Sequence, residues 1–144
     1  MNLTQHFTLA EMIRSGAAVR LNIANEPSAE VVKNLRLLCE NILEPLRRRF
    51  GVIRITSGYR CQALNQAVGG VGHSQHLCGE AADIHVSNRE VGLKMYHFIE
   101  KTLPYHQLFF EHRKSDGARW IHVSFHLERR RTKVQRRRSE NLII

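Results

Sequence analysis

The chain has 144 residues, and its 42% hydrophobic and 24% charged composition is that of an ordinary globular protein. This length fits one domain rather than two, and no apolar run approaches the roughly 18 residues that a membrane span requires. Three cysteines without a CxxC spacing argue against a disulfide framework, and the net charge of +9 is concentrated near the C-terminal end.

Two helices are predicted in the N-terminal part of the chain. The sequence Thr8-Leu9-Ala10-Glu11 is a capping box, which predicts a short helix over residues 9–15 that Gly16 ends. A long helix is predicted to begin at Asn25-Glu26-Pro27-Ser28, because the apolar residues that follow recur with a helical period. Pro45 should kink this helix near its end, since proline removes a backbone donor.

Strands and helices then alternate along the rest of the chain. Short apolar runs predict strands over residues 52–56, 81–86, 107–111 and 120–125. A helix is predicted over residues 61–67, and a second capping box, Ser87-Asn88-Arg89-Glu90, predicts a helix that continues to about Thr102. The last two strands should form a hairpin around Asp116-Gly117. The predicted fold is α+β, with helices packed on one face of a small, mostly antiparallel sheet and a site on the other.

The most informative segment runs from Ser74 to Asp83 and holds His76 and Asp83 on either side of a glycine. An imidazole and a carboxylate at this spacing can form half of a zinc site, and hydrolysis needs a third ligand and one open position. His122 is the candidate third ligand, because it alternates with apolar residues as on a strand. His85 shares a strand face with Asp83 and could replace His76 if that side chain points away.

The pattern Ser-x-His-x-x-Gly-x-Ala-x-Asp followed by Trp-x-His resembles the M15 zinc peptidases. These are D-Ala-D-Ala carboxypeptidases, dipeptidases and endolysin-type peptidases that cut peptidoglycan stem peptides. The resemblance includes Thr56-Ser57-Gly58-Tyr59-Arg60, covers about residues 7–126, and is closest to the small single-domain branch of phages and prophages. It implies the fold shared by D,D-peptidases and Hedgehog signalling domains, and one Zn²⁺ per chain held by His76, Asp83 and His122.

The resemblance also implies which residues hold the substrate. Arg60 matches the arginine that binds the substrate and the oxyanion of the transition state, and a guanidinium provides two fixed donors for both tasks. Tyr59, Ser74 and Gln75 are the other predicted substrate contacts, although Ser74 could equally brace the loop that carries His76.

The general base is less evident, because many M15 enzymes have an acidic residue three positions before the last histidine and this chain has Arg119 there. Glu111 is our candidate. If the hairpin pairs residue 111 with 120 and 109 with 122, Glu111 lies on the same face as His122 and close to it. Asp116 is the alternative, although its sequence context is that of a turn.

The chain is predicted to divide into a peptidase domain, residues 1–128, and a basic, mobile tail, residues 129–144. Such a tail could contact a polyanion, either an anionic cell envelope or nucleic acid. The first six residues lack the basic and apolar regions of a signal peptide. We therefore expect a protein that stays in the cytoplasm until it is released, or that a phage carries, before it acts on the cell wall. We also expect a monomer.

The first hypothesis is a zinc peptidase that uses metal-activated water to hydrolyse an amide bond in peptidoglycan stem peptides. It could be a carboxypeptidase or an endopeptidase of the D,D or L,D type. The alternative is a non-catalytic, metal-containing cell-wall-binding module of the same fold, which the departure at Arg119 allows. A basic nucleic-acid-binding protein is a third and weaker hypothesis, since the predicted ligand set does not require it.

Overall fold

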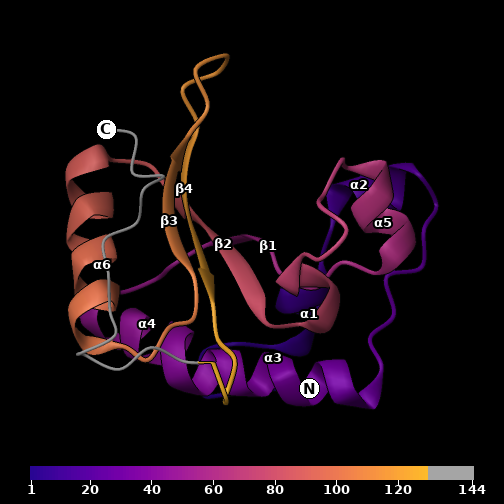
Figure 1. The fold of residues 1–144 in the computed structure, drawn as a ribbon, viewed down its shortest axis with the longest axis horizontal. Helices are drawn as coiled ribbons and strands as arrows, with labels where there is room; N and C mark the ends of the chain where they lie inside the picture. Colours follow the sequence, from indigo (N-terminus) through magenta and orange to yellow (C-terminus); the bar gives the residue numbers. More distant parts are fainter. Residues whose placement is uncertain (130–144) are drawn as a thin grey trace.

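The computed structural model describes residues 1–129, so only Arg129 of the predicted basic tail, residues 129–144, is described, and the rest of the tail lies outside the described residues and stays a prediction. Within this range the strands form one antiparallel sheet in the order β1-β2-β4-β3 (Figure 1). The α+β prediction is confirmed. The strands are β1 (Ile55–Ser57), β2 (Ala81–Val86), β3 (Leu108–His112) and β4 (Arg119–Ser124).

In the view of Figure 1, helices lie on both sides of the strands and connect them. The α-helices are α1 (Leu9–Ile13), α2 (Gly16–Arg20), α3 (Ala29–Leu38), α4 (Glu44–Phe50), α5 (Gln62–Ala67) and α6 (Arg89–Thr102). A π-helical turn, η1 (Cys39–Leu43), joins α3 to α4, and a short 3₁₀ helix, η2 (Gln75–Cys78), precedes β2. None of the described helices is long and apolar enough to cross a membrane.

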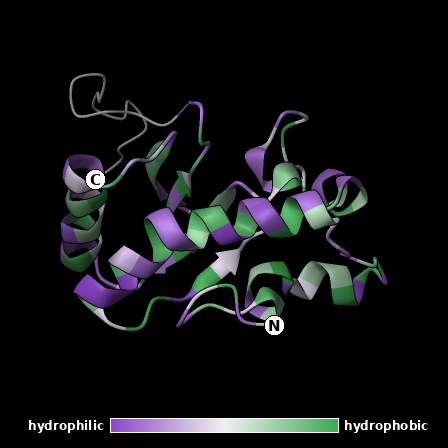
Figure 2. Ribbon diagram, turned by 90° about the horizontal axis from the view of Figure 1, so that it is seen from below, coloured by the Kyte–Doolittle hydropathy of each residue, from purple (hydrophilic) through white to green (hydrophobic). Residues whose placement is uncertain are grey.

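Period-two alternation gives the sheet one apolar and one polar face. Ile84 on β2, Ile121 on β4 and Phe110 on β3 are fully buried in the core. Leu35 of α3 and Tyr96 of α6 belong to the same hydrophobic cluster. Figure 2 shows hydrophobic and hydrophilic residues alternating around the long helical segment formed by α3, η1 and α4, as an amphipathic helix requires. The opposite face of the sheet is therefore left for polar side chains.

Two predicted helix boundaries are wrong. Gly16 does not end a helix, because Ser15 caps a new helix, α2, by accepting a hydrogen bond from the Ala18 N–H at 3.1 Å. The capping box predicted at Ser87 does not form either: Asn88 is the N-cap and accepts from the Val91 N–H at 3.1 Å. Serine and asparagine are comparable caps, so two adjacent candidates cannot be separated by propensity alone.

The long helix and the first strand also differ from expectation. The helix contains a π-helical turn just before Pro45 rather than a simple kink, because proline has no N–H to bond the carbonyl four residues earlier. The strand predicted over residues 52–56 is observed only as β1, and Val52 is 85% exposed. Because the Val52 side chain is not buried, it does not hold this end of the predicted strand against the sheet.

Gly92 of α6 allows the helix to lie close to the sheet. A Cβ atom on this residue would lie 2.5 Å from Val86 Cγ1 and 2.9 Å from Phe110 Cε2. We predict that Gly92→Ala destabilises the fold by about 1–3 kcal/mol. At an exposed helical position, where the added methyl group meets no neighbour, Gly→Ala normally stabilises a protein. The matched control is Gly16→Ala, whose nearest neighbour would be Arg20 Nη1 at 3.8 Å. Urea unfolding should show that Gly92→Ala lowers the free energy of unfolding and that Gly16→Ala raises it. A stabilised Gly92→Ala variant would contradict the close packing.

Glu44 is a buried carboxylate that ties the N-terminal segment to α4. Its Oε1 accepts from the His6 backbone N–H at 2.8 Å, and its Oε2 lies 2.6 Å from His6 Nδ1. Burial alone would raise the pKa of Glu44, but the hydrogen bonds from His6 outweigh it and lower the pKa. The charged form therefore stabilises the fold above the unfolded-state pKa, and this contribution is lost as the pH falls.

We predict that Glu44→Gln lowers the free energy of unfolding by about 1–3 kcal/mol at pH 7, and that its difference from wild type shrinks toward pH 3. The control is Glu40→Gln, an exposed glutamate on the same helical segment, which should have little effect at any pH. Denaturant unfolding over this pH range measures both. A difference that stays constant with pH would mean that the Glu44 charge is not the stabilising feature.

Candidate active site

Strand pairing brings two of the predicted metal ligands together. Asp83 on β2 lies directly opposite His122 on β4, so both side chains project from the polar face of the sheet. His76 reaches the same point from η2, the 3₁₀ helix that precedes β2. Residues from three separate parts of the chain therefore meet on one face.

The three side chains are close enough to share an ion. His122 Nδ1 lies 2.9 Å from Asp83 Oδ1, and His76 Nε2 lies 3.5 Å from Asp83 Oδ2. One donor atom of each residue lies within 4.8 Å of the others. Among the described residues, this is the group of histidine, cysteine and acidic side chains with the spacing of a metal site.

The orientation of His76 is fixed by contacts on either side of it. Its ring is buried, and Nδ1 lies 2.6 Å from the carbonyl oxygen of Gly58, a group that can only accept. Nδ1 therefore carries a hydrogen, and Nε2 is the nitrogen that faces Asp83 and that a metal ion would take in the neutral ring. Ser74 caps η2 by accepting from the His76 N–H at 3.1 Å, so Ser74 braces this loop.

Gly79, the glycine of the motif, lies at a position that only glycine can occupy without strain. It ends η2 in the left-handed region, with φ of 73°, and a Cβ atom there would lie 2.8 Å from the Val31 carbonyl oxygen. Any other residue would both strain the backbone and collide with α3. The turn thus holds His76 and β2 in fixed relation.

These residues fit a zinc ion. Two imidazole nitrogens and one carboxylate oxygen form the donor set of catalytic zinc sites, whose neighbouring ligand atoms lie about 3.3 Å apart in a tetrahedron. The separations of 2.9 and 3.5 Å bracket that value. Burial alone would raise the pKa of Asp83, but hydrogen bonds from His122 and His76 hold it well below its usual range. The carboxylate is therefore in the charged form that binds a cation.

Glu111 lies in the same pocket. The predicted register is confirmed, since Glu111 pairs with Trp120 and Phe109 with His122. Glu111 lines a cavity of about 710 Å³ together with Asp83 and His122. Burial raises the pKa of Glu111, and the nearby charge of Asp83 raises it further. His122 lowers this pKa, but by less than burial raises it. A carboxylate with a raised pKa suits proton transfer near neutral pH.

Asp116, the alternative base, is not part of this pocket. It lies in the turn between β3 and β4, where Arg113 Nε and Nη2 donate to its two carboxylate oxygens at 3.1 and 3.0 Å. The pocket is lined by Glu111 and not by Asp116. The structure therefore favours Glu111.

Three of the four predicted substrate contacts line the pocket, namely Arg60, Ser74 and Gln75. Arg60 Nη2 donates to Ser74 Oγ at 3.5 Å, and within the described residues its buried Nε has no hydrogen-bond partner. Tyr59 does not fit its prediction, because its side chain is packed in the hydrophobic core and does not line the pocket. These two neighbours in the chain thus point in different directions: Tyr59 into the core and Arg60 toward the pocket.

The other candidate ligands lie outside the cluster. His85 is exposed and borders a smaller adjoining cavity rather than meeting His76 and His122. The three cysteines are free thiols, as predicted, and none belongs to the cluster.

Several pocket residues were not singled out from the sequence. Phe109 stacks on His122, with ring centroids 5.8 Å apart, and it could have been found from the same alternation that selected Glu111. His106 and Gln107, just before β3, and Arg129, in the turn after β4, also line the cavity, but they carry no motif. Only the folded chain brings them to the site.

One of the comparisons with known proteins finds a matching family. The sequence model of a family described as Peptidase M15 matches residues 5–124, which include every residue of the cluster and Glu111. A search of curated proteins finds no match.

Proposed function

Because this chain belongs to the M15 family of peptidases, we propose that it is a zinc-dependent enzyme that hydrolyses an amide bond in peptidoglycan stem peptides. The observation that carries the proposal is the cluster of His76, Asp83 and His122 in a pocket that Glu111 and Arg60 also line. These groups provide a metal site, a proton acceptor and an anion-binding group within one cavity.

In this proposal each side chain has a separate task. A zinc ion held by the three ligands would polarise the scissile carbonyl and lower the pKa of water. Glu111 accepts a proton from the attacking water and delivers it to the leaving amine. Arg60 binds the negative charge that develops on the carbonyl oxygen, because its guanidinium group lines the same pocket. Ser74 and Gln75 orient the peptide.

The test is to incubate purified protein with peptidoglycan and with short peptides containing D-amino acids, and to identify the products by mass spectrometry. We expect release of peptide fragments that stops with a chelator and returns when zinc is added. The bond that is cut would distinguish carboxypeptidase from endopeptidase action. Binding to cell walls without any product, at every metal tested, would instead support the non-catalytic binding module.

A further inference from the structure

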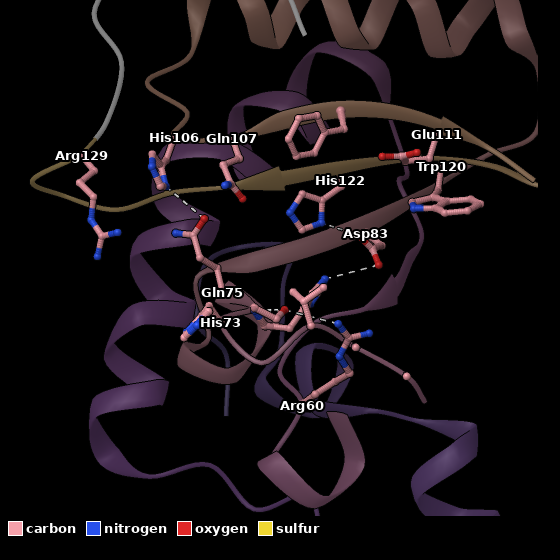
Figure 3. Close-up of a pocket in the computed structure, with 16 residues that line it drawn as sticks. Arg60, His73, Gln75, Asp83, His106, Gln107, Glu111, Trp120, His122 and Arg129 are labelled. Atoms are coloured by element: carbon pink, nitrogen blue, oxygen red, sulfur yellow. Dashed lines mark hydrogen bonds and ion pairs between the residues drawn. The ribbon is translucent and has the colours of Figure 1, made fainter. Parts of the chain in front are cut away.

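The candidate pocket has two chemically different ends (Figure 3). Glu111 and Trp120 lie at one end, Asp83 and His122 lie near the middle, and His106 and the residues around it lie at the other. If Glu111 protonates the leaving amine, the leaving group must lie at the Glu111 end. The acyl part of the substrate then extends toward His106.

Gln75 at the acyl end is held in one orientation. Its Nε2 donates to Glu80 Oε1 at 3.2 Å, which requires the amide nitrogen to face the carboxylate. Its Oε1 therefore faces His106 Nδ1, at 3.1 Å, and His106 carries a hydrogen on that nitrogen. The second oxygen of Glu80 lies 3.6 Å from His126 Nε2. Both carboxylate oxygens of Glu80 therefore already have protein partners, Gln75 and His126.

The acyl end also carries a cation. Arg129 lines the pocket on the same side as Gln75 and His106, and its backbone N–H donates to the His126 carbonyl at 3.1 Å in the turn after β4. The carboxylates that line the pocket, Asp83 and Glu111, lie at its middle and at the other end. Among the described lining residues, the acyl end therefore combines one positive charge with polar side chains and has no carboxylate of its own.

We propose that this end of the pocket selects an acidic peptide, one that carries a carboxylate on the acyl side of the scissile bond. Arg129 is the charged partner of that carboxylate, and Gln75 and His106 are the positioned polar contacts beside it. The inference rests on the proposed function and names its substrate class. It makes Arg129 a specificity-determining residue.

The experiment compares two peptide substrates that differ only in glutamate or glutamine on the acyl side of the cut. The zinc-loaded wild type should prefer the glutamate peptide by about 2–5-fold in kcat/KM, mainly through KM, because Arg129 is exposed and the contact is a solvent-screened charge pair. Arg129→Gln should bring the ratio close to one. Arg129→Glu should reverse the preference in favour of a lysine peptide. The control is Arg113→Gln, which removes an exposed cation from the β3–β4 turn and should keep the wild-type ratio.

Equilibrium binding of the same peptides to a Glu111→Gln variant provides a readout independent of turnover, and the same ratios are expected. If wild type cuts both peptides equally well, the acidic-peptide inference is overturned while the proposed function stands. If neither peptide is bound or cut by zinc-loaded protein, the inference and the proposed function both fail. An unchanged glutamate preference in Arg129→Gln would also overturn the role of Arg129.

Discussion

Asp83→Asn is expected to lose both bound zinc and peptidase activity. Asparagine keeps the size of the side chain but removes the charge, and Asp83 is the residue that both His76 and His122 contact. We expect zinc affinity to fall by at least about 100-fold and hydrolysis to fall to background. Elemental analysis after dialysis, together with product release, measures the two effects.

Thermal unfolding separates this loss from misfolding. Added zinc should raise the midpoint of wild type, because a ligand that binds only the folded state stabilises it, and should leave that of Asp83→Asn unchanged. The control is Asp116→Asn, since Asp116 is an exposed turn residue paired with Arg113. Equal zinc content in wild type and Asp83→Asn would rule out this ligand set.

Glu111→Gln is expected to keep its metal and lose turnover by about 10²–10⁴-fold. Glutamine preserves the shape and most of the hydrogen bonding, but it cannot accept the proton of the attacking water. Because Glu111 is not one of the three clustered ligands, its replacement should leave the donor atoms in place. Elemental analysis and kcat measured on one peptide test the two halves of the prediction.

A suitable control is Glu90→Gln, which changes an exposed glutamate in the first turn of α6. It should match wild type in both metal content and kcat. Retained activity in Glu111→Gln would falsify the role of Glu111 as the base. Loss of metal together with activity would instead identify it as a ligand or as support for one.

Local signals in the sequence predicted several elements well. The capping box at Thr8 and Glu11 forms as expected, with the Glu11 N–H donating to Thr8 Oγ1 at 3.2 Å. The strand over residues 81–86 has the predicted bounds, and the hairpin register around Asp116 and Gly117 is confirmed. These features depend on neighbours in the chain, because capping, alternation and turn geometry act over a few residues.

Features decided by packing across the chain could not be predicted in this way. Tyr59 is predicted at the site as part of the motif that ends at Arg60, but its side chain lies in the core. His106 reaches the pocket from the start of β3 and Arg129 from the turn after β4, and no motif marks either position. The hydrogen on His76 Nδ1 is set by the Gly58 carbonyl, 18 residues away in sequence. Each of these depends on which segment lies opposite, and a local pattern does not record that.

The sequence by itself determined the residue types of the candidate metal site and the strands that carry two of them. Only the tertiary structure decided that β4 lies between β2 and β3, so that Asp83 faces His122 directly. A hairpin signal predicts that β3 pairs with β4, but it does not name the second neighbour of β4. That neighbour follows from burying the apolar face of the whole sheet against the helices, a condition that depends on the entire folded chain.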